Sequence, residues 1–436
     1  MKKLICFLVC STIACCIYAQ ENSRRSLSDV EKIVGLSKCW SGVKYNFVYF
    51  DKLAFDWDSL YQATIPTVLA TKTDFEYFRE LQRFIASLKD GHTSVSWGRQ
   101  DLWDKWRQIP VATRLIEDKM IVTEVFNDTL EQKGIKKGME VVKINGIDVH
   151  EYVSTKIKPY IHSSTEQWLN ARAFGREATR GKKSEEIQLT FKDGKNVFER
   201  SISHSMSEKH SPPTPLFEFK EMENNIGLLK ISAFWGDNYI DQFDAIYEQL
   251  TSVDALIIDI RGNGGGNSGY SAYILSHLTA KKFKMSDWSS PFYVPANASW
   301  GYTNEWYLQK SPDYDPIEGK TIFSKPVVLL IDERTFSAAE DFCVGFRSMK
   351  RGTIIGTPSG GSTGNPIGFS LPGNGWVQIC TKKDTYPDGT EFVGIGILPD
   401  VEVKETLASY LSNMQSDTDK SLATAKAIEI LRSKKQ

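Results

Sequence analysis

Residues 327–343 read VVLLIDERTFSAAEDFC, a run of five apolar residues, a short polar turn and the start of a helical pattern. An apolar run of this length, with turn residues behind it, predicts a strand buried on both faces of a sheet. Behind the turn, Ala339, Phe342, Cys343 and Phe346 recur at the spacing of one helix face. The stretch therefore predicts a buried strand that leads directly into a helix packed on its sheet.

A similar pattern occurs earlier, in residues 255–266, which read ALIIDIRGNGGG. Residues 255–260 predict a second buried strand, and the three glycines behind it predict a tight loop. Strand and helix patterns alternate from about residue 216 onward. This alternation is typical of an α/β domain with largely parallel strands, which we expect over residues 209–436.

A β-rich unit is predicted over residues 102–208. Four runs have strand character: 120–126, 139–144, 187–191 and 197–202. Asn145-Gly146 is a favoured hairpin turn. Residues 134–149, GIKKGMEVVKINGIDV, resemble a phrase that recurs in PDZ domains, which bind extended peptides, often at a C-terminus, along a sheet edge. The resemblance implies a PDZ-like domain, and any other small β-rich domain is the alternative.

Residues 20–101 predict a helical segment. Phe75, Phe78, Leu81 and Phe84 recur at helical spacing, and a Lys-Asp-Gly turn signal follows them. Aromatic residues are dense here, so we expect the segment to pack against a neighbouring unit rather than to form an independent domain.

The first 19 residues have the pattern of a secretory signal peptide. Two lysines precede an apolar run over residues 4–18, which Ala19 ends. The run is too short and wrongly flanked for a membrane span. We expect cleavage after Ala19 and export to the periplasm or cell envelope. Lipid attachment at Cys15 or Cys16 is the alternative.

The charge of the chain is balanced, with 53 basic and 54 acidic residues and a net charge of -1. This balance gives no sign of nucleic acid or of an anionic membrane as a partner. Behind the signal peptide only Cys39, Cys343 and Cys380 remain, and no His/Cys cluster has metal-binding spacing. We therefore expect no metal and no other cofactor.

Ser337 lies at the predicted start of a helix, directly behind the polar turn. Unpaired backbone N–H groups and the helix dipole favour developing negative charge at such a position. The small Ala338 and Ala339 allow a substrate backbone to approach. Serine is also among the commonest helix caps, so the position alone does not separate a nucleophile from a structural cap.

The glycine-rich loop over residues 261–266 can bring backbone N–H groups to a ligand. It lacks the Lys-Ser/Thr of a phosphate-binding P-loop and the spacing of a dinucleotide loop. An oxyanion hole is the better interpretation. The N–H of Gly264 or Gly265, together with that of Ala338, would hold the oxyanion of a tetrahedral intermediate.

Three motifs in this order resemble the C-terminal processing, or tail-specific, peptidase family S41. They are LIIDIRGNGGG at residues 256–266, VLLIDERTFSAAEDF at residues 328–342 and GIGILPDVEV at residues 394–403. The resemblance covers most of the chain behind the signal peptide. It implies a ClpP/crotonase-like α/β core, an exported serine endopeptidase that acts on peptides or proteins, and Ser337 as its nucleophile.

The general base differs between two branches of this family. In the serine–lysine branch a lysine follows the nucleophile in a glycine-rich stretch, but residues 359–365, SGGSTGN, contain none, and Lys382 and Lys383 come next. The tricorn-like branch uses a histidine before the PDZ-like unit, and residues 89–93, KDGHT, resemble its motif. His92 is therefore the predicted base, since a neutral imidazole suits that role near pH 7.

In the tricorn-like branch a serine beside the histidine and a late glutamate complete the site. Gly91 stands in the place of that serine. The register puts Val393 at the acid position, and on a strand Glu391 would share its face. Glu391 is therefore predicted to orient the imidazole, with Asp384 and Asp388 as alternatives.

The glycine-rich stretch that contains Gly360, Gly361, Ser362 and Thr363 is predicted to line the bound substrate strand. Two other functions remain open at this point. One is a catalytically silent envelope protein that binds peptides with the cleft and the PDZ-like unit. The other is an acyl-CoA enzyme, which the signal peptide disfavours because CoA substrates are cytosolic.

Overall fold

A six-stranded mixed sheet forms the centre of the C-terminal half of the chain. The structure is a computed structural model and describes residues 26–98, 106–209, 212–414 and 419–433. In order across the sheet, the strands are β10 (Phe217–Met222), β11 (Ile226–Ile231), β12 (Ala255–Asp259), β15 (Val327–Ile331), β16 (Gly352–Gly356) and β20 (Val401–Glu402). β10 pairs antiparallel, and the other neighbours pair in parallel. The predicted α/β architecture is confirmed.

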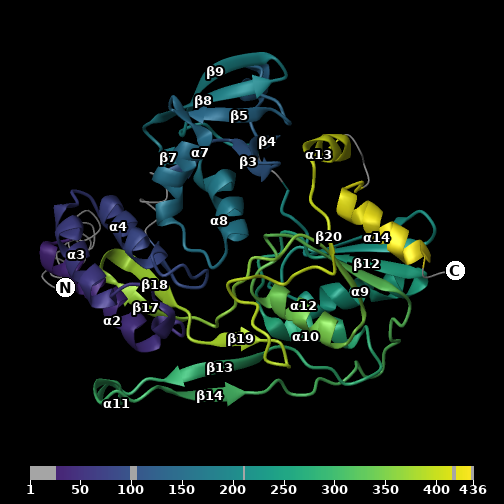
Figure 1. Ribbon diagram of the computed structural model, residues 1–436. Coiled ribbons are helices and arrows are strands. Elements are labelled where there is room, and N and C mark those ends of the chain that lie inside the picture. The colour runs from purple at the N-terminus through teal and green to yellow at the C-terminus, as the bar shows by residue number, and fades with distance from the viewer. Residues whose placement is uncertain (1–25, 99–105, 210–211, 415–418, 434–436) are drawn as a thin grey trace, which may run out of the picture.

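Helices cover both faces of this sheet (Figure 1). One face carries α9 (Tyr239–Ser252), α10 (Ser268–Ser276) and α12 (Ala338–Ser348), and the other carries α14 (Leu422–Ser433). All residues of β12 and β15 are buried, as expected for strands packed on both sides. Because neighbouring parallel strands end at the same edge, the loop after β12 and the turn after β15 lie together.

The β-rich unit has its own apolar core and lies at the top of Figure 1. In order across its sheet, the strands are β3 (Val111–Ile116), β4 (Lys119–Val125), β5 (Glu140–Ile144), β8 (Glu186–Asp193) and β9 (Asn196–Ser203). The four predicted runs correspond to the last four of these strands. Asn145 and Gly146 have φ angles of 51° and 78°, the positive values that an Asn-Gly hairpin adopts.

The N-terminal helices share a core with strands from the far end of the chain. α2 (Asp29–Asn46), α3 (Trp57–Ala70) and α4 (Asp74–Ala86) pack on a sheet of β1 (Ser94–Trp97), β18 (Gly375–Ile379) and β17 (Ile367–Leu371). The segment is therefore packed against a neighbour, as its aromatic content predicts.

Residues 287–309 form an arm that the pattern analysis did not identify. β13 (Asp287–Phe292) and β14 (Glu305–Gln309) pair antiparallel, with α11 (Pro295–Ser299) between them, and β13 also pairs with β19 (Lys383–Thr385). In Figure 1 the arm extends from the central domain beneath the N-terminal helices. Asn304 at its far end donates a hydrogen bond of 3.3 Å to Asp51.

The predicted signal peptide, residues 1–19, lies outside the described residues, as do Cys15 and Cys16. In the part of the chain that the structure describes, no helix has the length and apolar character needed to cross a bilayer.

Candidate active site

Ser337 occupies the sharp turn between β15 and α12 with an unusual backbone conformation. Its φ is 57° and its ψ is -124°, a region that costs a non-glycine residue about 1–3 kcal/mol. Its N–H donates to Ser362 O at 3.1 Å and to Glu340 Oε2 at 3.2 Å, and these bonds hold the turn in place. The conformation presents the hydroxyl at the helix N-terminus, as expected for a nucleophile on a strand-to-helix turn.

His92 reaches this hydroxyl from the other end of the chain. It lies in the turn after α4, and its Nε2 is 3.0 Å from Ser337 Oγ. The side chain is buried, and that burial, with the nearby Lys382 ammonium as the second cause, lowers the pKa of His92 to about 4. The imidazole is therefore neutral at pH 7 and able to accept the serine proton.

Buried polar groups fix the turn that carries His92. Asp90 accepts hydrogen bonds from the His92 N–H at 3.0 Å and from Thr93 Oγ1 at 2.7 Å. The Gly91 N–H donates to Ser164 Oγ at 2.8 Å, which ties the turn to the β-rich unit. Burial raises the pKa of Asp90 to about 6.

Aromatic stacking holds the imidazole from one side. The ring of Phe336 lies 4.8 Å from that of His92, with an angle of 6° between their planes. Trp168 stacks on Phe336 in turn, at 4.9 Å. Trp168 belongs to α8 (Glu166–Arg172) of the β-rich unit, so three distant segments meet at the base.

The second nitrogen of the imidazole faces a hydroxyl. His92 Nδ1 lies 2.8 Å from Ser362 Oγ, which is fully buried. A Cβ built on Gly91 would lie 2.7 Å from the same Oγ. A serine at position 91 would therefore collide with Ser362, whose hydroxyl already occupies this space next to the imidazole.

The predicted oxyanion-hole donors differ in whether their N–H groups already have an acceptor. Among the described residues, we find no hydrogen-bond acceptor for the N–H of Gly264 or for that of Ala338. Gly265 is different, because its N–H donates to Asn263 Oδ1 at 2.9 Å. A Cβ on Gly265 would lie 2.7 Å from Ser337 Cβ, so this glycine allows close approach instead of donating to a ligand.

Ser337 and Ser362 lie within a region that a known family model covers, whereas His92 precedes that region. Residues 225–403 match the model of peptidase family S41. These residues form a peptidase family S41 domain. The predicted resemblance is confirmed.

Sequence relatives cover the chain in part. The carboxy-terminal processing protease CtpA of Bacillus subtilis is 23% identical over 303 residues, which are 69% of this chain and 56% of that protein. The carboxy-terminal-processing protease of Bartonella bacilliformis is 34% identical over 94 residues, 22% of either chain. The chain thus spans between about a fifth and somewhat over half of the length of these relatives.

The fold of the whole chain is also similar to a solved structure. Mature CPAF complexed with lactacystin aligns with a TM-score of 0.70 and 15% sequence identity, covering 93% of this chain and 98% of that one. At this identity the likeness shows the fold, and it confirms the predicted fold class.

Glu340 of the S41 domain is a polar group that the sequence analysis missed. It lies in the first turn of α12, is fully buried, and accepts hydrogen bonds from Ser359 Oγ at 2.5 Å, from the Gly361 N–H at 2.8 Å and from the Ser362 N–H at 2.9 Å. Burial raises its pKa to about 8. A glutamate three residues after a serine at the start of a helix is the capping-box pattern, and this is the signal that could have revealed it.

The stretch predicted to line the substrate packs within the protein next to Ser337 and His92. Gly360, Gly361, Ser362 and Thr363 are all buried. The Gly360 N–H donates to Thr335 O, and the next two N–H groups donate to Glu340. The N–H groups of Gly360, Gly361 and Ser362 are therefore used within the protein and are not free to bind a substrate strand.

The structure does not bring Glu391 to the imidazole. Its carboxylate is 43% exposed and binds Lys383 and, at 3.3 Å, Lys52. The prediction needed a strand through residues 391–393, but Val393 lies in a turn, so the two side chains do not share a strand face.

The alternative acids and lysines are also occupied elsewhere. Lys382 donates to the buried Asp384 at 2.8 Å, and Asp388 accepts the Thr390 N–H at 2.9 Å. Over the described residues, no group of three or more His, Cys, Asp or Glu side chains is arranged to hold a metal ion.

Proposed function

We propose that the protein is a serine endopeptidase that hydrolyses peptide bonds of protein or peptide substrates. The observation that carries the proposal is the pair of contacts through His92, to Ser337 Oγ on one nitrogen and to Ser362 Oγ on the other. The sequence relatives are carboxy-terminal processing proteases, which agrees with this chemistry.

In the proposed mechanism His92 accepts the Ser337 proton at Nε2 while Ser337 Oγ attacks the substrate carbonyl carbon. Nδ1–H donates to Ser362 Oγ throughout, which stabilises the imidazolium, while Ser337 Oγ is now bonded to the carbonyl carbon. The oxyanion lies against the N–H groups of Ala338 and Gly264. Transfer of the proton from Nε2 to the amine nitrogen breaks the C–N bond and leaves an acyl ester on Ser337.

Hydrolysis of the ester repeats the same transfers. A water molecule gives a proton to His92 Nε2 and adds to the acyl carbon, and Ser337 Oγ leaves with that proton. His92 returns neutral to the next cycle. A pKa of about 4 keeps it neutral between turnovers at pH 7.

We also assign peptide binding to the β-rich unit, as its PDZ-like sequence predicts. β3 is an edge strand of its sheet, and α8 lies beside it. A cavity of about 500 Å³ is lined by residues of both elements and by the S41 domain. An extended peptide, bound at its C-terminus, would add to the β3 edge there.

Export of the protein remains part of the proposal, on the strength of the N-terminal pattern alone. Mass spectrometry of the protein from a cell-envelope fraction tests it, because cleavage after Ala19 gives a mature chain that begins at Gln20. A chain that retains residues 1–19 in the cytoplasm would overturn it.

Digestion of an unfolded protein tests the peptidase proposal. The mature chain should release peptides from a reduced, carboxymethylated protein, while Ser337→Ala should be slower by about a thousandfold or more. Equal rates for parent and Ser337→Ala would overturn the proposal and favour the silent peptide-binding alternative.

A further inference from the structure

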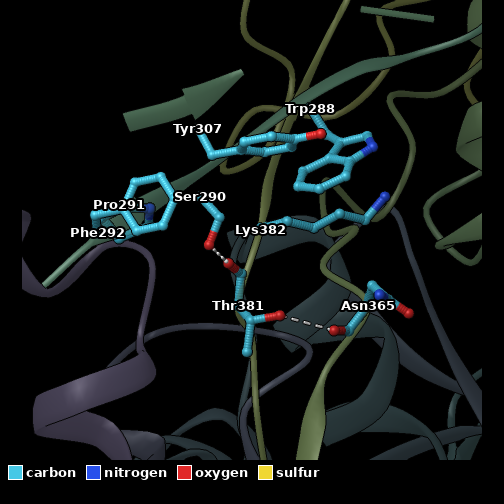
Figure 2. A pocket seen from close by; sticks show the side chains of 8 residues that line it. All are labelled: Trp288, Ser290, Pro291, Phe292, Tyr307, Asn365, Thr381 and Lys382. Atoms are coloured by element: carbon cyan, nitrogen blue, oxygen red, sulfur yellow. Dashed lines mark hydrogen bonds between the residues drawn. The ribbon is translucent and has the colours of Figure 1, made fainter. Parts of the chain in front are cut away.

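A pocket with an aromatic wall opens between the arm and the segment next to the catalytic histidine (Figure 2). Its volume is about 330 Å³. It is lined by Trp288, Ser290, Pro291, Phe292, Tyr307, Asn365, Thr381 and Lys382. The first five of these come from β13 and β14, and the last three from the segments that flank His92.

One side of the pocket is formed by backbone that packs next to His92. A Cβ built on Gly364 would lie 3.2 Å from the His92 Cβ, and Gly364 O accepts the N–H groups of Thr381 at 3.2 Å and of Lys382 at 3.3 Å. Asn365, the next residue, is exposed at the edge of the pocket. The pocket and the base thus share one short piece of backbone.

The other side is attached to the helix that carries the nucleophile. Asp341, one turn after Ser337 in α12, accepts a hydrogen bond of 2.6 Å from Ser286 Oγ, and Ser286 directly precedes β13. One helical turn rises about 5.4 Å, so the arm is fixed close to Ser337. The arm that forms the aromatic wall therefore begins next to the helix that carries Ser337.

The lining favours apolar chemistry. Ser290 Oγ donates to Thr381 O at 2.8 Å, and Thr381 Oγ1 donates to Asn365 O at 2.9 Å, as the dashed lines in Figure 2 show. The Tyr307 hydroxyl donates to Gln309, and the Lys382 ammonium donates to Asp384. These polar groups already have partners, so they offer few further hydrogen bonds to a polar side chain that loses its water on entering the pocket.

Three aromatic side chains and the aliphatic stem of a lysine form the apolar part of the wall. Figure 2 shows the Lys382 stem running beneath the Trp288 ring, with Tyr307 beside it and Phe292 at the far end. Phe292 is 58% exposed and Tyr307 is 44% exposed, so a ligand would cover aromatic surface that now faces water. The volume suits one or two side chains.

We propose that this pocket is a specificity subsite that binds a large apolar side chain, aromatic or aliphatic, of the peptide substrate near the bond attacked by Ser337. This inference rests on the proposed peptidase function, because that function is what makes the bound peptide a substrate. The affinity of the pocket for an apolar side chain does not depend on catalysis and is measured separately.

Binding to the full-length Ser337→Ala chain tests the subsite. The probes are dye-labelled decapeptides of Gly and Ser with one central Phe, Leu or Asp, followed by fluorescence anisotropy. We expect the Phe and Leu peptides to bind about tenfold more tightly than the Asp peptide. Adding Trp288→Ala should reduce this preference to about twofold or less.

Two further variants keep the result interpretable. Tyr307→Ala, whose side chain is more exposed, should also reduce the preference if Trp288→Ala proves unstable in thermal melts. Trp300→Ala is the matched control, because Trp300 lies on the same arm, is 71% exposed and does not line the pocket. An unchanged preference in folded Trp288→Ala and Tyr307→Ala, or an equal loss in Trp300→Ala, would overturn the inference.

The failure of this inference can be told apart from that of the peptidase function. Diisopropyl fluorophosphate, whose small substituents do not need the pocket, reports whether Ser337 is reactive in the parent chain. Labelling with no apolar preference would leave the peptidase and remove the subsite. An apolar preference that depends on Trp288, without labelling, would leave the pocket and remove the catalytic role.

Discussion

Ser362 Oγ lies 2.8 Å from Nδ1 of His92, in the position from which a carboxylate would orient the imidazole of a proposed base. A hydroxyl can accept the Nδ1–H and so select the tautomer whose Nε2 is free to take the Ser337 proton. It carries no charge, so it leaves the pKa of the imidazole under the control of burial and of Lys382.

The activity should persist to unusually low pH. Loss of the neutral imidazole as pH falls through its pKa of about 4 should give kcat/KM an acid limb near pH 4, well below the limb near pH 6.5 of an unperturbed histidine. Lys382→Met removes a positive charge that disfavours the imidazolium, so its limb should move to higher pH. The measurement is kcat/KM from pH 3.5 to 8. A parent limb at 6.5, or a downward shift in Lys382→Met, would contradict the account.

Replacing Ser362 by alanine should lower kcat by about tenfold with little change in KM, because a neutral hydrogen bond of about 1.5 kcal/mol is lost from the base. Steady-state kinetics on one peptide measures both constants. Glu391→Gln is the comparison, and it should retain the parental kcat because its carboxylate binds Lys383 and Lys52. The reverse order of effects would show that the acid, rather than the hydroxyl, orients His92.

Gly91→Ser should destabilise the protein and lower its activity, because the new Cβ would lie 2.7 Å from Ser362 Oγ and 2.9 Å from Ser362 Cβ. Combining it with Ser362→Gly removes both atoms of residue 362. The hydroxyl introduced at position 91 then takes the place of the one that is lost. The double variant should therefore melt at a higher temperature than Gly91→Ser alone. If the loss of stability in the double variant equals the sum of the losses in the two single variants, the steric relationship is wrong.

Glu340→Leu should lower the free energy of unfolding by about 3 kcal/mol or more, because it leaves several buried donors without a partner. Urea unfolding followed by circular dichroism measures this loss. Glu340→Gln retains one acceptor oxygen and should lose less. A matched exposed acid, Glu305→Leu, should stay within about 0.5 kcal/mol of the parent.

Local patterns were sufficient to predict the central domain and most strands of the β-rich unit. The apolar run of β15 and the inner stripe of α12 are each encoded within a few residues, and so is the Asn145 turn. The arm was not predicted, because β14 is exposed along its whole length and has no alternation of apolar and polar positions.

The candidate site, too, was predicted from the sequence only in part. Ser337 and His92 stand in recognisable local motifs, although 245 residues separate them. The role of Ser362 depends on where a glycine-rich stretch lies in space, which Glu340 fixes through bonds to two of its N–H groups. The Glu391 prediction failed because its register assumed a strand where the chain turns.

The most direct test of the central claim is covalent labelling of Ser337 by diisopropyl fluorophosphate, followed by intact-mass spectrometry at pH 7. We expect one adduct per parent chain, none on Ser337→Ala, and labelling of His92→Ala slowed by about a hundredfold or more. His150→Ala, which removes a half-exposed histidine outside the site, should label at the parental rate. A parent chain that remains unmodified, or a His92→Ala variant that labels as fast as the parent, would contradict the Ser337–His92 mechanism.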